Sequence, residues 1–200
     1  MGLTIHPVGS DALLVECADL PEAMALHAEA RRRQVMALDV VPGARTVLFD
    51  GITDPAALAD EIGTWRIEAG TSEAGDLVEL PTSYDGPDLG DVARHWDMTR
   101  DEVVATHRGT EFVVAFCGFA PGFAYCSGLP DRLTVPRLDS PRTKVPAGSV
   151  GLAGAFTGVY PTASPGGWRI IGTTTASLWD VDRESPALLA PGTRVRFVDA

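Results

Sequence analysis

Two hundred residues, of which 45% are hydrophobic and 22% charged, make up a chain with a net charge of −11 at pH 7. This length and composition indicate an ordinary globular protein with a buried core, in one large domain or two small ones. Strong acidity argues against a nucleic-acid partner, and the absence of a signal peptide or an apolar run of about 18 residues argues against secretion and membranes, so we expect a cytoplasmic protein.

The first part of the chain alternates short strands and helices. Strands are predicted at 4–8, 12–16 and 46–50, and helices at 21–38 and 54–67. The first helix is predicted from apolar residues at steps of three and four. The second is predicted from Asp54 and Pro55, which suit an N-cap and a first helical position. We therefore expect a small two-layer α/β domain in the order β-β-α-β-α.

The acidic, small-residue segment EAGTSEAGD at 68–76 is the best candidate for a linker, which gives domains at 1–75 and 76–200. Beyond it, strands are predicted at 77–81, 111–117, 169–172, 177–180 and 193–198, and helices at 89–96 and directly after Thr99. Thr99 and Glu102 have the spacing of a capping box. Many short strands separated by turns favour a closed or nearly closed antiparallel barrel, so the fold class is α+β.

Residues 118–168 combine nine glycines and seven prolines with many aromatic side chains. Proline fixes φ and glycine permits positive φ, so we expect rigid, packed turns rather than a flexible linker. Residues 120–169 hold five basic and two acidic residues, a net charge of +3 in a chain whose remainder carries −14. A basic island in an acidic protein suits a small carboxylate or phosphate, because arginine binds such groups through two parallel hydrogen bonds.

Few residues show a recognisable catalytic pattern. The four histidines lack metal-ligand spacing, so no metal site is predicted, and Ser149 does not stand in a nucleophile elbow. His107 ends the capped helix, where it serves either the helix dipole or proton transfer. The segment PGGW at 165–168 is either a backbone cradle for an anion or a tight turn held by Trp168. No phosphate-binding loop of the Walker type occurs in the sequence.

A longer string of residues resembles a known family. It consists of GFAPGFAY at 118–125, PR at 136–137 and 141–142, VPAGSVG at 145–151, TGVYP at 157–161 and SPGGW at 164–168. The string is similar to that of the family of 5-oxoprolinase B subunits, also called allophanate hydrolase subunit 1, which includes the sporulation kinase inhibitor KipI. With further similarity at 9–16, 85–89, 99–107 and 191–197, the resemblance spans nearly the whole chain.

The resemblance implies an N-terminal α/β domain and a cyclophilin-like β-barrel. It also implies one subunit of an ATP-dependent hydrolase that opens a cyclic amide, most simply 5-oxoprolinase, which converts pyroglutamate to glutamate. Such a protein would be inactive alone and would work with a barrel-fold C subunit, and possibly an A subunit, with ATP and magnesium used by the complex. The alternatives are a KipI-like inhibitor of a histidine kinase, an allophanate hydrolase or urea-amidolyase-related subunit or, from the barrel alone, a prolyl isomerase.

Site residues follow from the same resemblance. His107, Arg137 and Arg142 are the expected catalytic residues, the two arginines as a clamp on substrate carboxylate or transferring phosphate. Substrate contacts are expected from Phe119, Pro121, Phe123, Tyr125, Lys144, Ser149, Thr157, Tyr160, Ser164, Gly166, Gly167 and Trp168. One departure is Phe156, which stands where the family commonly has glutamine; the loss of that amide puts one substrate contact in question.

Overall fold

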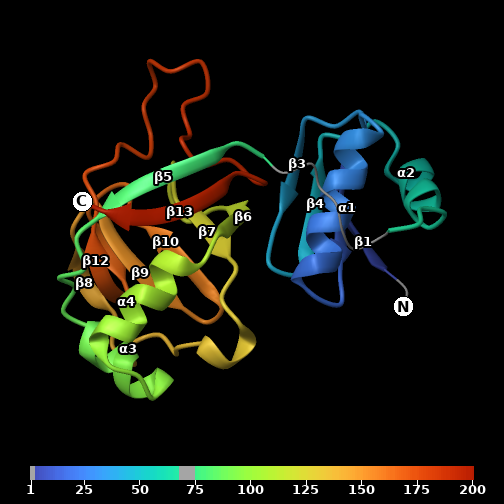
Figure 1. Cartoon of the computed structure of the whole chain (residues 1–200). Helices are drawn as coiled ribbons and strands as arrows, with labels where there is room; N and C mark the ends of the chain where they lie inside the picture. Colours follow the sequence, from blue (N-terminus) through green and yellow to red (C-terminus); the bar gives the residue numbers. More distant parts are fainter. Residues whose placement is uncertain (1–2, 68–74) are drawn as a thin grey trace. The chain divides into compact units, whose positions relative to one another are not determined.

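The computed structural model describes residues 3–67 and 75–200, and its contacts divide the chain into two units, Met1–Glu73 and Ala74–Ala200 (Figure 1). The predicted linker falls largely on residues 68–74, outside the described residues. Each unit has its own apolar core, and each is described separately.

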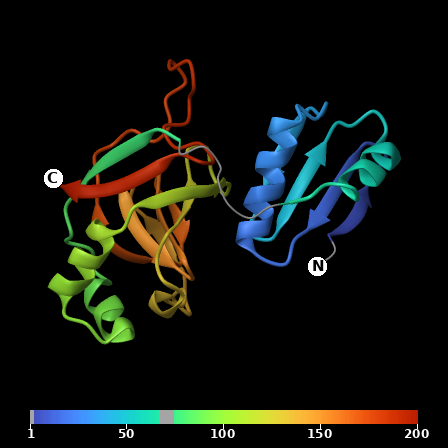
Figure 2. The same ribbon diagram turned by 45° about the vertical axis from the view of Figure 1, so that its right-hand side comes forward.

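The first unit is a four-stranded antiparallel sheet with two helices (Figure 2). The strand order is β1-β2-β4-β3, for β1 (Thr4–Val8), β2 (Ala12–Glu16), β3 (Asp39–Pro42) and β4 (Thr46–Asp50). Helices α1 (Leu20–Arg32) and α2 (Pro55–Ile62) begin at Asp19 and Asp54, whose carboxylates accept hydrogen bonds from backbone N–H groups of the first turn. Side chains of both helices and of the sheet form one apolar cluster, as expected of two layers.

Two helix ends in this unit were predicted wrongly. Helix α1 ends at Arg32 instead of residue 38, because Gln34 adopts a left-handed backbone with φ of 54°. The chain then turns into β3, a strand that the sequence prediction missed, so the order is β-β-α-β-β-α. Helix α2 ends at Ile62 instead of residue 67, although Trp65 beyond its end is still buried.

The second unit is built on a seven-stranded sheet in the order β12-β9-β10-β7-β6-β13-β5. Its strands are β5 (Leu77–Thr82), β6 (Phe112–Cys117), β7 (Ala124–Ser127), β9 (Ser149–Ala153), β10 (Phe156–Val159), β12 (Arg169–Thr173) and β13 (Arg194–Asp199). An antiparallel bridge between Ser83 and Thr173 joins the two edges, so the predicted nearly closed barrel is confirmed. The prediction of purely antiparallel strands is wrong at one pair, because β13 runs parallel to β5.

Helices α3 (Leu89–Trp96) and α4 (Arg100–Gly109) lie in front of the barrel strands in Figure 1 and bury Val92, Trp96 and Val103 in the barrel core. The predicted helix at 89–96 and the Thr99–Glu102 capping box are confirmed. The predicted strand at 177–180 is wrong, because only one isolated bridge, Trp179 with Ala187, forms there. The apolar residues that alternate in this segment lie in an irregular loop, which projects from the barrel (Figure 1).

A short antiparallel pair, β8 (Arg142–Val145) and β11 (Ser164–Gly166), completes the unit together with the 3-10 turn η1 (Asp131–Leu133). Val145 of β8 belongs to a second apolar cluster that is separate from the barrel core. This cluster contains most of the aromatic residues of the 118–168 stretch, and the candidate site lies on it.

Candidate functional site

Side chains of the neighbouring strands β9 and β10 point alternately into the barrel core and toward the second apolar cluster. Val150 and Leu152 of β9 and Val159 of β10 belong to the barrel core, whereas Ala153 and Phe156 contact the second cluster. Because successive side chains of a strand point to opposite faces, the second cluster lies on the outer face of these strands. Its buried members are Phe123, Val145, Ala153, Tyr160, Trp168 and Ile170.

Aromatic rings meet edge to face around Phe123. Its ring centroid lies 5.3 Å from that of Tyr160 and 5.2 Å from that of Trp168. Tyr125 continues the group, stacked on Phe116 at 4.4 Å and edge-on to Phe156 at 5.8 Å. We call the set of Phe116, Phe119, Phe123, Tyr125, Phe156, Tyr160 and Trp168 the aromatic face.

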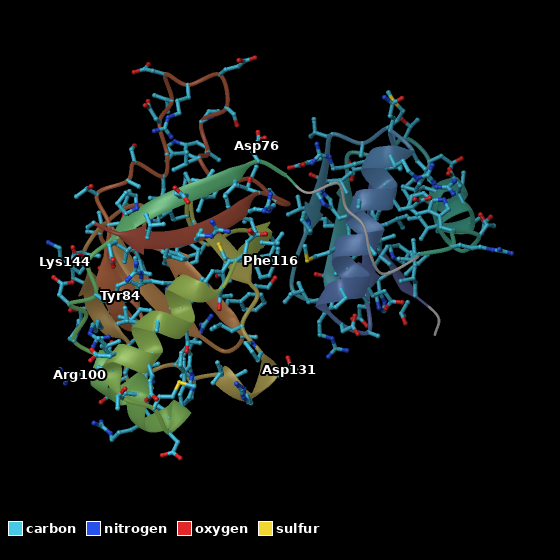
Figure 3. The ribbon with its side chains drawn as sticks, viewed as in Figure 1. Asp76, Tyr84, Arg100, Phe116, Asp131 and Lys144 are labelled. Carbon is cyan, nitrogen blue, oxygen red and sulfur yellow. The ribbon has the colours of Figure 1, made fainter. Side chains whose placement is uncertain are left out.

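Only part of the aromatic face reaches solvent. Phe123, Tyr160 and Trp168 are buried, whereas Phe116, labelled in Figure 3, and Tyr125 are partly exposed. Phe156, also partly exposed, thus lies beside the predicted contact Tyr125. The buried rings form a rigid support, and the partly exposed ones offer an apolar surface on which a planar group can lie.

Two glycines make room for the indole of Trp168. Gly151 of β9 and Gly158 of β10 are cross-strand partners, and a Cβ atom on Gly151 or Gly158 would lie 3.2 Å from Trp168 side-chain atoms. Gly166 has a similar role, since a Cβ there would collide with the phenol of Tyr160. Gly151, Gly158 and Gly166 therefore allow close packing of aromatic rings.

Arg137 presents a free cation next to the aromatic face. It is exposed and forms no salt bridge among residues 3–67 and 75–200. Its backbone is fixed on both sides, because Leu138 N–H donates to the Gly167 carbonyl at 2.7 Å and Arg169 Nε donates to the Pro136 carbonyl at 3.0 Å. Burial raises the pKa of the Tyr160 phenol, and the nearby positive charge of Arg137 acts in the opposite direction.

Lys144 and Arg142 differ in how much of their charge is available. Lys144, at the edge of the barrel unit in Figure 3, is exposed and has no salt-bridge partner in the described part of the chain. Arg142 is engaged: its Nη2 lies 2.7 Å from Oδ1 of Asp88, and its Nη1 donates to the Trp168 carbonyl at 3.4 Å. The predicted clamp of two arginines thus has one guanidinium already bound to a buried carboxylate.

His107 lies inside the barrel, with none of its surface exposed. Its Nε2 is 2.9 Å from Oγ1 of Thr157 and its Nδ1 is 2.8 Å from the Tyr84 hydroxyl. Because Thr157 donates to the Gly151 carbonyl, Nε2 must carry the proton and Nδ1 must accept from Tyr84. Burial lowers the pKa of His107 to about 3, so the neutral ring and not a dipole-paired cation occupies this place.

The remaining predicted contacts fall into two groups. Ser149 and Thr157 are buried and face away from solvent in this structure, as His107 does. Pro121 is exposed, and Gly166, at the end of β11, and Gly167 are partly exposed just before Trp168. The hydroxyl of Ser164 is buried without a hydrogen-bond partner among the described residues. The segment 165–168 thus joins the end of β11 to the buried Trp168, and its use as an anion cradle stays a prediction.

Two residues that belong to this region were not predicted. Asp88 stands at the N-cap position of α3, but its side chain makes no capping bond and turns to Arg142. Phe116 looked like a core residue of a buried strand; an irregularity in the β6–β7 pairing between Val114 and Phe116 changes the side to which its ring points. Neither feature has a local sequence signal.

No group of three or more His, Cys, Asp or Glu side chains lies together in a way that could hold a metal ion within 3–67 and 75–200. Every helix in the same ranges is too short or too polar to span a lipid bilayer.

Comparison with known proteins places the chain among relatives of one kind. Residues 3–189 match the model of the carboxyltransferase domain, subdomain C and D. The 5-oxoprolinase B subunit of Haemophilus influenzae is 36% identical over 207 residues, covering 98% of this chain and 97% of that protein. The protein of the same name from Escherichia coli O157:H7 is 43% identical over 169 residues, 80% of this chain and 77% of that one.

Solved structures agree with this fold. The conserved uncharacterized protein PH0987 from Pyrococcus horikoshii is 32% identical, with a TM-score of 0.60 over 98% of this chain and 97% of that chain. TTHA0988 is 32% identical with a TM-score of 0.78 over 95% of this chain, which spans only 40% of that longer chain. The K. lactis urea amidolyase shares the fold with a TM-score of 0.73 at 21% identity, over 99% of this chain and 15% of that one.

Proposed function

Because the chain belongs to the family of 5-oxoprolinase B subunits and carries the carboxyltransferase domain of subdomains C and D, we propose that it is part of an ATP-dependent hydrolase that opens pyroglutamate to glutamate. The observation that carries this proposal is the similarity to relatives of that name along nearly the whole chain. We further propose that it works in the cytoplasm with a barrel-fold C subunit, and with an A subunit, and that it is inactive alone.

The candidate site supports a substrate of this kind. Pyroglutamate is a small planar lactam that carries one carboxylate. Arg137 offers an unpaired guanidinium for the carboxylate, and Lys144 adds a second positive charge in the same stretch, both unpaired within the described residues. The partly exposed rings of Phe116, Tyr125 and Phe156 offer an apolar surface for the lactam ring.

Hydrolysis of the lactam adds water across its C–N bond. The carbonyl carbon takes the hydroxyl group, the nitrogen takes the bond's electron pair and a proton, and an amine and a new carboxylate result. Negative charge develops on the carbonyl oxygen during the attack, and nearby cations stabilise it best when they are held in position beforehand. Arg137, whose backbone is fixed on both sides, is proposed to bind the substrate carboxylate, so that the lactam is held in place for this step.

Use of ATP is proposed at the level of the complex. Arg137 and Lys144 could contact phosphate oxygens, since both are unpaired within the described ranges. Carboxylates that could hold magnesium beside such a phosphate do not gather anywhere in those ranges, and the sequence has no Walker-type loop. We therefore derive no reaction step through ATP from the residues of this chain.

Co-expression with candidate C and A subunits tests the proposal. We expect a complex that co-elutes on gel filtration and releases glutamate from pyroglutamate only when ATP and magnesium are supplied. Allophanate serves as the competing substrate in a parallel assay, and Arg132→Gln, an exposed arginine on η1, serves as the control for loss of charge. Separate elution of the chain and its C partner, or turnover of allophanate alone, would contradict it.

A further inference from the structure

Both carboxylate oxygens of Asp88 accept hydrogen bonds from groups outside α3, the helix that Asp88 precedes. The residue is 5% exposed and stands at the N-cap of α3, yet it makes no capping bond with its side chain. Oδ1 accepts from Nη2 of Arg142 at 2.7 Å, and Oδ2 accepts from the backbone N–H of Ile170 at 2.6 Å. The backbone N–H of Asp88 in turn donates to the Ile170 carbonyl at 2.9 Å.

Arg142 connects Asp88 to the backbone just before β12. Its second nitrogen donates to the Trp168 carbonyl at 3.4 Å, so that Asp88, Arg142 and the backbone at 168–170 form a continuous set of hydrogen bonds. The same turn holds the backbone next to Arg137, because the Gly167 carbonyl accepts from Leu138 N–H at 2.7 Å. Contacts therefore run without a gap from a buried carboxylate to the residue that carries the free guanidinium.

We propose that Asp88 is a positioning residue of the candidate site, which acts through Arg142 to fix the Gly167–Trp168 turn and thereby the backbone that carries Arg137. Asp88 touches no part of the exposed aromatic face that would meet a ligand; its effect passes through Arg142 and Ile170. The proposal rests on the proposed function only for its kinetic test, since its structural test needs no substrate.

The chemistry of the two bonds requires a carboxylate at this position. Both oxygens accept, one from a guanidinium and one from a backbone N–H. An asparagine has one accepting oxygen and one donating NH₂ group, so Asp88→Asn must place a donor against a donor on one side. Arg142 would lose its charged partner in either orientation of the amide, and one orientation would also lose the bond at Ile170, so the turn would loosen without a change in side-chain size.

Hydrogen exchange of the isolated chain, read by mass spectrometry, tests the structural half. We expect Asp88→Asn to raise exchange at least tenfold at Ile170 and at Leu138, the second of which Asp88 does not touch. Glu111→Gln is the matched control, because it breaks the ion pairs of Glu111 with Arg194 and Arg196 elsewhere in the same barrel. Faster exchange at Ile170 with full protection at Leu138 would overturn the proposal.

Kinetics of the reconstituted complex test the functional half. We expect Asp88→Asn to raise KM for pyroglutamate about tenfold and to change kcat less than threefold, as Arg137→Gln should, with less than the product of the two effects in the double variant. An unchanged KM, or fully multiplicative effects, would contradict a positioning role. Arg142→Lys, which keeps the charge but loses the second donor to Trp168, replaces Asp88→Asn if that variant does not fold.

Failure of the proposed function is distinguishable from failure of this inference. A wild-type complex without turnover of pyroglutamate would reject the substrate proposal, and the exchange experiment would still decide whether Asp88 fixes the backbone at Leu138.

Discussion

The hydroxyl of Tyr84 donates a 2.8 Å hydrogen bond to Nδ1 of His107 inside the barrel of the second unit. His107 comes from α4, whereas Tyr84 follows β5, so the bond ties the helical layer to the edge of the sheet. Thr157 of β10 completes the chain on the other side of the ring. Both ring nitrogens are hydrogen-bonded while the ring is neutral, whereas protonation of Nδ1 would make the Tyr84 hydroxyl accept there and deprive the hydroxyl proton of its acceptor.

Acid should therefore destabilise the barrel unit as pH falls below 6.5. Burial lowers the pKa of His107 from 6.5 to about 3, so between these values the unfolded chain binds a proton that the folded chain does not. The contribution of neutral His107 is fully present above pH 6.5 and is lost progressively as pH falls toward 3. We expect a loss on the order of a few kcal/mol over this window, measured as the free energy of unfolding in urea.

The variant His107→Gln isolates this effect, because its amide can still donate to Thr157 but does not titrate. Its unfolding free energy should be lower than that of the wild type at pH 7.5, and the difference should shrink as pH falls to 5. Burial also lowers the pKa of His27 in the first unit, and that contribution stays the same in both proteins. Equal slopes for the two proteins between pH 7.5 and 5 would show that His107 does not control the acid response.

Thr157→Val should destabilise the barrel unit by about 1–3 kcal/mol, because it leaves the Nε2–H of His107 buried without an acceptor. Valine matches threonine in shape, so the change removes the hydroxyl and little else. Thr157→Ser keeps the hydroxyl and should cost clearly less. Urea unfolding at pH 7.5 measures both, and a valine variant as stable as the serine variant would mean that the His107 bond contributes nothing net.

Local signals predicted both helices of the barrel unit and strands β5, β6, β12 and β13, but missed β7, β9 and β10 and gave none of the pairing. The capping box at Thr99 and Glu102 correctly predicted the start of α4, because four consecutive residues are enough to form this motif. The parallel pairing of β5 with β13 joins Leu77 to Arg194, and no local pattern encodes a partner at that separation. Strand β3 was missed because the left-handed Gln34 that ends α1 has no distinctive sequence.

The candidate site shows the same limit. Density of glycine, proline and aromatic residues correctly indicated a packed segment at 118–168, but the prediction of turns was incomplete, because strands β7 to β11 also lie there. The excess of basic residues indicated where cations gather. Arg137 and Arg142 look alike in the sequence, however, because the carboxylate that binds Arg142 belongs to Asp88, 54 residues away. His107 looked available for proton transfer, since its burial depends on strands that meet only in the fold.

Arg137→Gln should raise KM for pyroglutamate in the reconstituted complex by about 10- to 100-fold, the range expected for one hydrogen bond to a charged group. Stability should stay within about 0.5 kcal/mol of wild type, because Arg137 is exposed and makes no salt bridge in the described part of the chain. Steady-state kinetics and thermal unfolding check the two expectations. A large loss of stability, or an unchanged KM, would exclude Arg137 as the residue that binds the substrate carboxylate.

Gly158→Ala should destabilise the barrel unit by about 1–3 kcal/mol through overpacking. The added Cβ would lie 2.7 Å from the Ala124 carbonyl oxygen and 3.2 Å from the Trp168 ring, and both belong to buried residues that cannot move aside easily. Gly118→Ala is the matched control in the same stretch, because a Cβ there meets nothing within 4 Å. Equal urea midpoints for the two variants would mean that the aromatic face is packed more loosely than this structure shows.

Phe119 should be one of the few positions at which glycine is better than alanine. Its backbone has a φ of 73°, in the left-handed region, and its side chain is 61% exposed. Removal of the ring therefore loses little burial, and alanine keeps the backbone strain that glycine relieves. We expect Phe119→Gly to be more stable than Phe119→Ala by about 1 kcal/mol, measured by urea unfolding at pH 7.5. An alanine variant that equals or exceeds the glycine variant would show that residue 119 does not hold this conformation in solution, and the turn that places its ring against Phe123 and Tyr160 would have to be drawn differently.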